Sequence, residues 1–168
     1  MTISMYQASV PVFLQLLNGL SKNLEKATAH AAARKIDPAA FLGARLFPDM
    51  FTLVKQVQLS TDFAKGAGAR LAGIDVPKYS DSEASFEELQ ERIAKTVAFL
   101  KSLTPAQIDG SEEREINLMQ GGKPVVLKGQ QYLLATAMPN FYFHIATTYG
   151  LLRHNGVEIG KRDFMGNS

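Results

Sequence analysis

The chain of 168 residues contains no cysteine and no tryptophan, and it has only three histidines. Without cysteine it cannot form a disulfide scaffold, a Cys-ligated zinc or iron–sulfur centre, or a thiol nucleophile. Its net charge of +2 is too small for the strongly basic surface of an electrostatic nucleic-acid binder. What remains is a chain of the length expected for a single domain, residues 1–168.

Two stretches, residues 1–21 and 129–152, contain no Lys, Arg, Asp or Glu. The first has no basic residue before its apolar part and no small-residue cleavage pattern, so we do not expect a secretory signal. The second is long enough to span a bilayer, but its many amides and hydroxyls are typical of a helix enclosed by other helices. We therefore predict a cytoplasmic protein that enters no membrane.

Apolar residues recur at helical spacing in four long segments, residues 5–35, 48–73, 82–104 and 130–154. Pro11 is expected in the first turn of the first helix or at a bend, and Ser21 can cap its continuation. Pro48 is expected to open the second long helix, and Pro139 to interrupt the last one. A short helix is predicted near residues 39–44.

The periodicity changes at residues 115–128, where alternating residues surround Gly121-Gly122 as in a two-stranded hairpin. An isolated hairpin is marginal in water, so this one must lie against the helices. The sequence thus predicts an all-α fold, an antiparallel four-helix bundle with a small β-hairpin before the last helix. The tail, residues 157–168, is expected to pack as irregular chain or to reach a partner subunit.

No sequence motif indicates nucleophilic catalysis or phosphate binding. A G-x-S-x-G turn is absent, and Gly121-Gly122-Lys123 is followed by Pro124 rather than by Ser or Thr. The histidines are also poorly spaced for a metal, because His144 and His154 are ten residues apart, about 15 Å along a helix. A zinc site needs at least three protein ligands, so carboxylates such as Asp49 or Asp62 would have to complete it. His30 could reach His144 only if the first helical segment ended at the same level.

His144 is the most informative single residue. Thr148 lies one turn later on the same helix face, with Tyr149 beside it. One interpretation is a ligand or acid–base group directed into the bundle, and the other is a core histidine hydrogen-bonded to Gln56 or Asp49.

Other conspicuous side chains have structural interpretations. Asp62 and Arg70 share one face of their helix, and each needs a partner if it is partly buried. We predict a structural ion pair there, with Arg153 as a candidate partner for Asp62. The aromatic residues 141–143 and Tyr149 are expected in the core or in a dimer interface.

Two blocks of the sequence carry a family resemblance. LFPDMFTLVKQVQLSTDFAKGAGARLAG (residues 46–73) and PNFYFHIATTYGLLRHNGVEIGKRDFMG (residues 139–166) resemble an uncharacterised bacterial family in the DinB/YfiT-like superfamily. The similarity covers nearly the whole chain. It implies a four-helix bundle that is commonly dimeric.

The superfamily also implies a metal site. Its members include metal-dependent transferases and isomerases that use low-molecular-weight thiols, with zinc or nickel held by a histidine of the second helix and an H-x-x-x-H pair of the last. Here His144 matches the first histidine of that pair, Thr148 stands in place of the second, and residues 48–73 contain no histidine. A threonine hydroxyl is a poor ligand for these metals compared with imidazole.

The leading hypothesis is a homodimeric small-ligand-binding or structural module with a degenerate metal site and no cofactor. The alternative is a metal-dependent thiol-transferase or isomerase that uses a divalent metal, Zn or Ni. The candidate site residues are the same for both: His144 as the lone metal candidate, with Thr148, Tyr149, Asp49, Gln56 and Asp62. A third hypothesis is an assembly module that uses its aromatic residues and tail.

Overall fold

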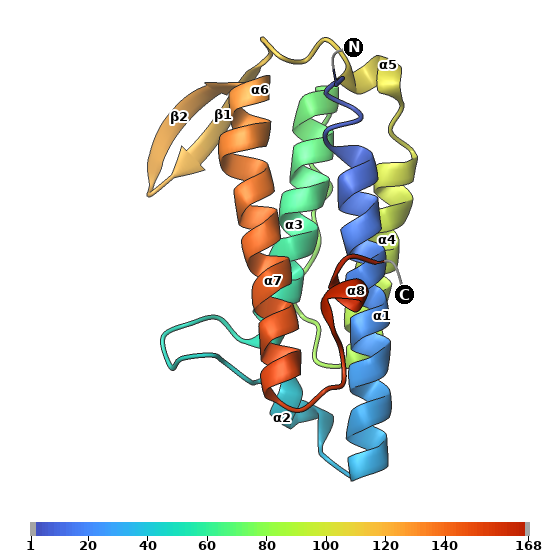
Figure 1. Ribbon diagram of the computed structural model, residues 1–168. Coiled ribbons are helices and arrows are strands. Elements are labelled where there is room, and N and C mark those ends of the chain that lie inside the picture. Colours follow the sequence, from blue (N-terminus) through green and yellow to red (C-terminus); the bar gives the residue numbers. More distant parts are fainter. Residues whose placement is uncertain (1–2, 167–168) are drawn as a thin grey trace.

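The computed structural model describes residues 3–166. In these residues four long helical segments lie side by side (Figure 1): α1 (Val10–Arg34), α3 (Leu53–Ala72), α4 (Phe86–Lys101), and the consecutive α6 (Gly129–Tyr132), η1 (Leu133–Ala137) and α7 (Met138–His154). The shorter elements are α2 (Pro38–Leu42), α5 (Pro105–Ile108), α8 (Lys161–Phe164), and a hairpin of β1 (Glu115–Gln120) and β2 (Lys123–Lys128). The prediction of a mostly helical fold with a small hairpin before the last helix is confirmed.

The directions of the helices differ from a simple up-and-down arrangement. Helix α1 is antiparallel to α4, and α3 is antiparallel to α7, but α3 and α4 run the same way (Figure 1). Arg92 of α4 contacts Thr61 of α3, and Leu100 lies beside Gly68, so residue numbers rise together along both helices. The connection of residues 74–85 therefore returns along α3, as long crossover connections do in helical bundles.

The core lies between the four long segments. Phe13 of α1 meets Phe141 of α7 edge to face, with ring centroids 4.8 Å apart, and both side chains are fully buried. Leucines of every long segment belong to the same core; among those inaccessible to solvent are Leu17, Leu24, Leu71, Leu89, Leu100, Leu133 and Leu152. Each such side chain contributes roughly 1.5–3 kcal/mol of hydrophobic free energy.

Helix α1 is a single continuous helix. Pro11 lies in its first turn, where the missing N–H costs no hydrogen bond. Ser21 is not a cap, because it lies in mid-helix and its hydroxyl donates to Gln90 Oε1 of α4 at 2.6 Å. The helix ends at Arg34, and the next residue, Lys35, is a non-glycine residue in the left-handed region with φ of 53°.

The prediction that Pro48 opens the second long helix is wrong. Helix α3 begins at Leu53, where the Thr52 hydroxyl accepts a hydrogen bond from the Lys55 N–H at 3.4 Å. Residues 43–52 instead form an excursion whose ends meet, with the Leu53 N–H donating to the Ala44 carbonyl at 3.0 Å. A side-chain cap thus fixes the helix start, rather than the proline four residues earlier.

The predicted two-stranded hairpin around Gly121-Gly122 is present. Strand β1 pairs antiparallel with β2 from Glu115↔Lys128 to Gln120↔Lys123. Gly121 and Gly122 form the turn with φ of +56° and +77°, which is the conformation that favours glycine at both positions.

The last long helical segment is continuous through Pro139. In place of the predicted interruption, it contains a change in hydrogen bonding just before the proline. Residues 133–137 form a π-helical turn, in which the Met138 N–H donates to the Leu133 carbonyl. Pro139 follows in the first turn of α7, and the wider turn before it accommodates a residue that cannot donate a backbone hydrogen bond. No helix within residues 3–166 combines the length and the apolar character that crossing a membrane requires.

The tail is more ordered than predicted. Val157 and Ile159 are buried, and the following residues form α8, which packs against α1. Gln15 Nε2 donates to the Met165 carbonyl at 2.8 Å, and Lys26 pairs with Asp163 at 2.5 Å. The prediction of irregular chain over 157–168 is therefore wrong for α8, and residues 167–168 lie outside the described range.

Candidate functional site

His144 lies on the face of α7 that packs against α3, and only 6% of its surface is exposed. Its Nδ1 is 2.7 Å from Gln56 Oε1, which confirms the predicted contact with that glutamine. Phe63 stacks on the imidazole with centroids 5.5 Å apart, and Phe143 meets it edge-on at 5.2 Å. The ring is therefore enclosed by one amide and two aromatic side chains.

This environment keeps the imidazole neutral. Burial lowers the pKa of His144 to about 4, because desolvation disfavours the charged ring. An amide oxygen can only accept, so in this contact Nδ1 carries the ring proton and Nε2 keeps its lone pair. Chemically, His144 is a neutral acceptor at pH 7 and not a charged acid.

The other predicted site residues are not brought to the free nitrogen of His144. Thr148 is buried, but its hydroxyl donates to the backbone carbonyl of His144 at 2.9 Å. The ring of Tyr149 packs against Phe164 of α8, with centroids 5.8 Å apart. Asp49 is exposed in the excursion before α3, so the alternative hydrogen bond from His144 to Asp49 is not formed.

The histidines are also separate from one another. His30 meets Phe41 of α2 edge to face at 5.9 Å and approaches Gly156, while His154 is exposed at the end of α7. Across residues 3–166 no group of three or more His, Asp or Glu side chains is placed to hold a metal ion. The donor set around His144 is thus one imidazole and one amide.

Asp62 belongs to a different cluster, on the side of α3 that faces α4. It pairs with Lys65 and, at 2.7 Å, with Nη2 of Arg92. The predicted partner, Arg153, instead donates to the Val157 carbonyl at 3.3 Å. An ion pair of Asp62 is therefore present, but its predicted partner is wrong, and Arg70 takes no part in it.

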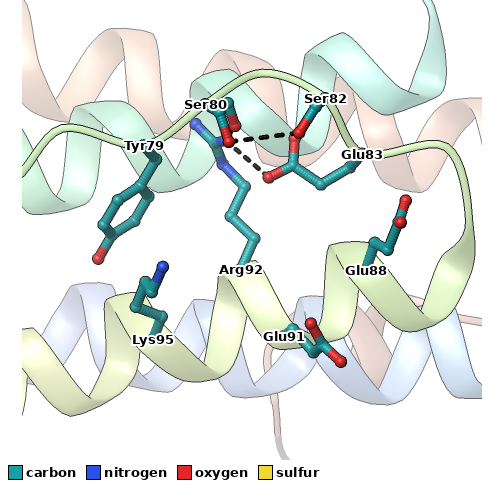
Figure 2. A pocket seen from close by; sticks show the side chains of 8 residues that line it. All are labelled: Tyr79, Ser80, Ser82, Glu83, Glu88, Glu91, Arg92 and Lys95. Atoms are coloured by element: carbon teal, nitrogen blue, oxygen red, sulfur yellow. Dashed lines mark hydrogen bonds and ion pairs between the residues drawn. The ribbon is translucent and has the colours of Figure 1, made fainter.

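Arg92 is the centre of this cluster. Figure 2 shows its side chain reaching from α4 toward Ser80 and Glu83 of the connection before that helix. Its guanidinium bonds Glu83 Oε1 at 2.9 Å, the Ser80 carbonyl at 3.0 Å and Thr61 Oγ1 at 2.7 Å, and its side chain is 2% exposed. Arg92 is buried although it is charged, because the carboxylates of Asp62, Asp81 and Glu83 and the Thr61 hydroxyl compensate the cost of its burial.

The cluster is electrostatically balanced. Burial by itself raises the pKa of the Glu83 carboxyl, but hydrogen bonds from Arg92, the backbone and Gln58 outweigh it and hold that pKa below its usual range. Hydrogen bonding and positive charge from Lys55 lower the pKa of Asp81. A cavity of about 270 Å³ opens here beside Tyr79, whose ring has Lys65 Nζ at 4.4 Å. These pairings fix the connection onto α3 and α4, which is a structural role.

A larger cavity, of about 680 Å³, lies between the hairpin and the helices α3 and α6–η1–α7. Phe63 forms part of its wall, so one aromatic ring touches both this cavity and His144. Tyr132, Thr136 and Asn140 face it from the segment around the π-helical turn. Such turns are frequent at functional sites. Sequence reasoning missed this cavity, because its lining residues come from segments that are distant in the sequence.

The comparisons with known proteins agree with this fold. A solved structure described as a DinB family member protein from Shewanella denitrificans matches with a TM-score of 0.87 and 40% sequence identity, over 96% of this chain and 91% of that chain. The chain is thus a DinB-like protein. Residues 5–165 match the family described as Domain of unknown function (DUF1993), and the chain belongs to that family. A search of the curated proteins found no match. The resemblance inferred from the two sequence blocks is confirmed.

Proposed function

We propose that this protein is a small-ligand-binding module on a four-helix bundle, in which the metal site of the wider superfamily is degenerate. The environment of His144 carries the first part of the proposal. One imidazole, already hydrogen-bonded to Gln56, offers a single free nitrogen where a zinc site needs at least three ligands. The Thr148 hydroxyl donates to the backbone carbonyl of His144. Asp49 is exposed in the excursion before α3, and Asp62 pairs with Arg92.

Metal titration tests this part. Purified protein is titrated with zinc and with nickel by calorimetry, and its metal content is measured after dialysis, for the wild type and for His144→Ala. We expect both proteins to retain far less than one equivalent of either metal. One equivalent in the wild type that is lost in His144→Ala would instead support the alternative, a metal-dependent thiol-transferase or isomerase.

The cavity beneath the hairpin carries the second part. Its volume of about 680 Å³ lies within the range of small-molecule sites, roughly 300–1,000 Å³. Its wall combines apolar side chains such as Phe63 and Leu118 with polar ones such as Arg70 and Asn140, as ligand pockets do.

Blocking the cavity tests it. Thr136→Trp places an indole at a position that lines the cavity, whereas Ala135→Trp places the same group at an exposed neighbour. In a ligand-observed NMR screen of fragments, we expect the wild type and Ala135→Trp to share a set of binders that Thr136→Trp loses. Identical binders for all three proteins would contradict a site in this cavity.

The proposed module is a homodimer. Phe47, Phe51 and Phe143 are 64%, 53% and 54% exposed. Two of them lie near His144, because Phe143 contacts its ring and the Phe51 carbonyl accepts from Gln56. Exposed large apolar side chains are typical of protein interfaces when they lie together, which we propose for these three.

A further inference from the structure

The cavity beneath the hairpin contains one charged side chain, Arg70, and no acidic residue among those that line it. Its other polar lining groups are neutral amides and hydroxyls, and its apolar wall includes Phe63, Leu118, Met119 and Pro124. A site of this composition favours a ligand with one negative charge and an apolar body.

The position of Arg70 is fixed by contacts with Gly66 and Tyr132, and not by an ion pair. Its guanidinium folds back over Gly66, one turn earlier in α3, so that a Cβ atom at residue 66 would lie 2.5 Å from Nη1. That nitrogen donates to the Tyr132 hydroxyl at 3.1 Å, and the guanidinium carbon lies 5.8 Å from the centre of the tyrosine ring. Among residues 3–166 no carboxylate is within ion-pair distance of Arg70.

Tyr132 supplies a second donor. The residue is 2% exposed, and its hydroxyl accepts from Arg70, which leaves the phenolic proton free to donate. In the described part of the chain no acceptor takes that proton. The unused donors of a guanidinium and a phenol thus lie together at the wall of one cavity.

We propose that this cavity binds a small organic carboxylate through Arg70 and Tyr132, with the apolar body of the ligand against Phe63 and the hairpin. The planar fork of a guanidinium matches the two oxygens of a carboxylate, and the phenol can donate to one of them. A single positive charge suits a monoanion better than a phosphate dianion. This inference rests on the proposed small-ligand function and specifies the ligand class.

The test uses hydrocinnamate as the carboxylate probe and hydrocinnamamide as its neutral match, with binding followed by calorimetry and by NMR shifts of the protein. We expect the carboxylate to bind saturably and the amide at least about tenfold more weakly, because the amide cannot accept the charge-assisted pair. Acetate and inorganic phosphate, which lack the apolar body, are expected to bind more weakly than hydrocinnamate.

Three variants locate the site. Arg70→Gln is expected to weaken hydrocinnamate binding about tenfold and to remove its preference over the amide. Gly66→Ala displaces the guanidinium with a helix-favouring residue, so we expect weaker binding in a protein at least as stable as the wild type. Arg162→Gln removes the same charge from an exposed position of α8 and should bind like the wild type.

Two results would overturn the inference. One is equal binding of the carboxylate and the amide, and the other is hydrocinnamate binding that Arg70→Gln leaves unchanged. In either case, fragments that bind the wild type but not Thr136→Trp would still support a ligand cavity. A wrong ligand class can therefore be distinguished from a wrong proposed function. Absence of any saturable binding, both of the carboxylates and of the neutral fragments, would contradict both.

Discussion

A buried histidine without a charged partner makes the stability of this protein depend on pH. The pKa of His144 is lowered to about 4 in the folded chain, against about 6.5 in the unfolded chain. Between these values the unfolded state binds more protons, so the free energy of unfolding falls as pH is lowered. The contribution of neutral His144 is therefore present above about pH 6.5 and lost progressively toward pH 4.

His144→Gln should remove this part of the pH dependence, since glutamine does not titrate and can still bond Gln56. Between pH 7 and pH 5 we expect the wild type to lose about 2 kcal/mol more unfolding free energy than the variant. Urea denaturation of both proteins at the two pH values measures the difference. The carboxylates titrate in both proteins, so their contribution cancels when the two losses of unfolding free energy are compared. Equal losses in the two proteins would show that His144 is protonated without cost.

At this scale the sequence predicted one contact and missed another. The pairing of His144 with Gln56 could be anticipated, because both are polar residues on the inner faces of two long helices. The pairing of Asp62 with Arg92 could not, because it depends on α3 and α4 running in the same direction. Periodicity gives the face of each residue but not the partner helix that covers it.

At the scale of elements, the docking of α8 onto α1 requires a close approach of the backbone at Gly19. A Cβ atom at Gly19 would lie 2.9 Å from the Asp163 carbonyl oxygen and 3.0 Å from the Phe164 carbonyl oxygen. Because these are backbone atoms, the tail would have to move away. Gly150, in α7, has no atom within 4 Å of the same position.

The same substitution should therefore have opposite effects at the two sites. Gly150→Ala is expected to stabilise the protein by about 0.5–1 kcal/mol, through helix propensity alone. Gly19→Ala is expected to destabilise it by about 1–3 kcal/mol, as overpacking does. Urea denaturation measures both changes, and faster hydrogen exchange confined to residues 157–166 in Gly19→Ala would locate the cause. Stabilisation by both alanines would refute a docked tail.

The connection from α3 to α4 is held by a cluster of charged contacts centred on Arg92. Arg92→Met retains the aliphatic stem but leaves Glu83, whose side chain is 12% exposed, without its cation. We expect a loss of about 3 kcal/mol, as for other broken buried pairs. Lys55→Met removes a cation from the more exposed pair with Asp81 and should cost about 0.5 kcal/mol.

Acid should reveal the same difference. The lowered pKa values of Glu83 and Asp81 mean that their ion pairs contribute stability at neutral pH, which is lost as pH falls and the carboxylates are protonated. The free energy of unfolding, measured by denaturation at a series of acidic pH values, should therefore fall less steeply with decreasing pH for Arg92→Met than for the wild type. Equal costs for Arg92→Met and Lys55→Met would contradict a central role for Arg92.

Element boundaries were predictable where backbone chemistry decides them. Two glycines with positive φ specify the hairpin turn, and the Ser85 hydroxyl caps α4 by accepting a hydrogen bond from the Glu88 N–H. The start of α3 was missed because Pro48 and Thr52 are both good helix-opening residues, and only the folded excursion selects Thr52. The π-helical turn was missed because it alters hydrogen bonding without ending the helix.

For the whole molecule, the unpredicted feature is the cavity beneath the hairpin. Its walls come from α3, the hairpin and the segment around the π-helical turn, which are distant in sequence and meet only in the folded chain. Arg70 has no sequence pattern that distinguishes it from a solvated helix residue. Its lack of a carboxylate partner becomes visible only when every neighbour in residues 3–166 is placed.

The proposed dimer is a property of the same scale. A stable interface buries about 800 Å² on each subunit. The residues that contribute most of its binding energy lie near its centre, so we expect the three exposed phenylalanines there. Phe47 and Phe143 are the most exposed of the three, at 64% and 54%. Replacing both by serine should therefore remove the anchor without disturbing the core.

Sedimentation equilibrium tests the dimer. We expect the wild type to have twice the 18.4 kDa mass of one chain, and Phe47→Ser/Phe143→Ser to have the mass of a single chain with unchanged helical circular dichroism. Val126→Ser is the matched control, because this hairpin residue is 56% exposed and belongs to a different surface. A monomeric wild type would refute the dimer, and dissociation by Val126→Ser in place of the double variant would move the interface to the hairpin. In that case the partner subunit would lie at the strands that wall the ligand cavity, and carboxylate binding would depend on protein concentration.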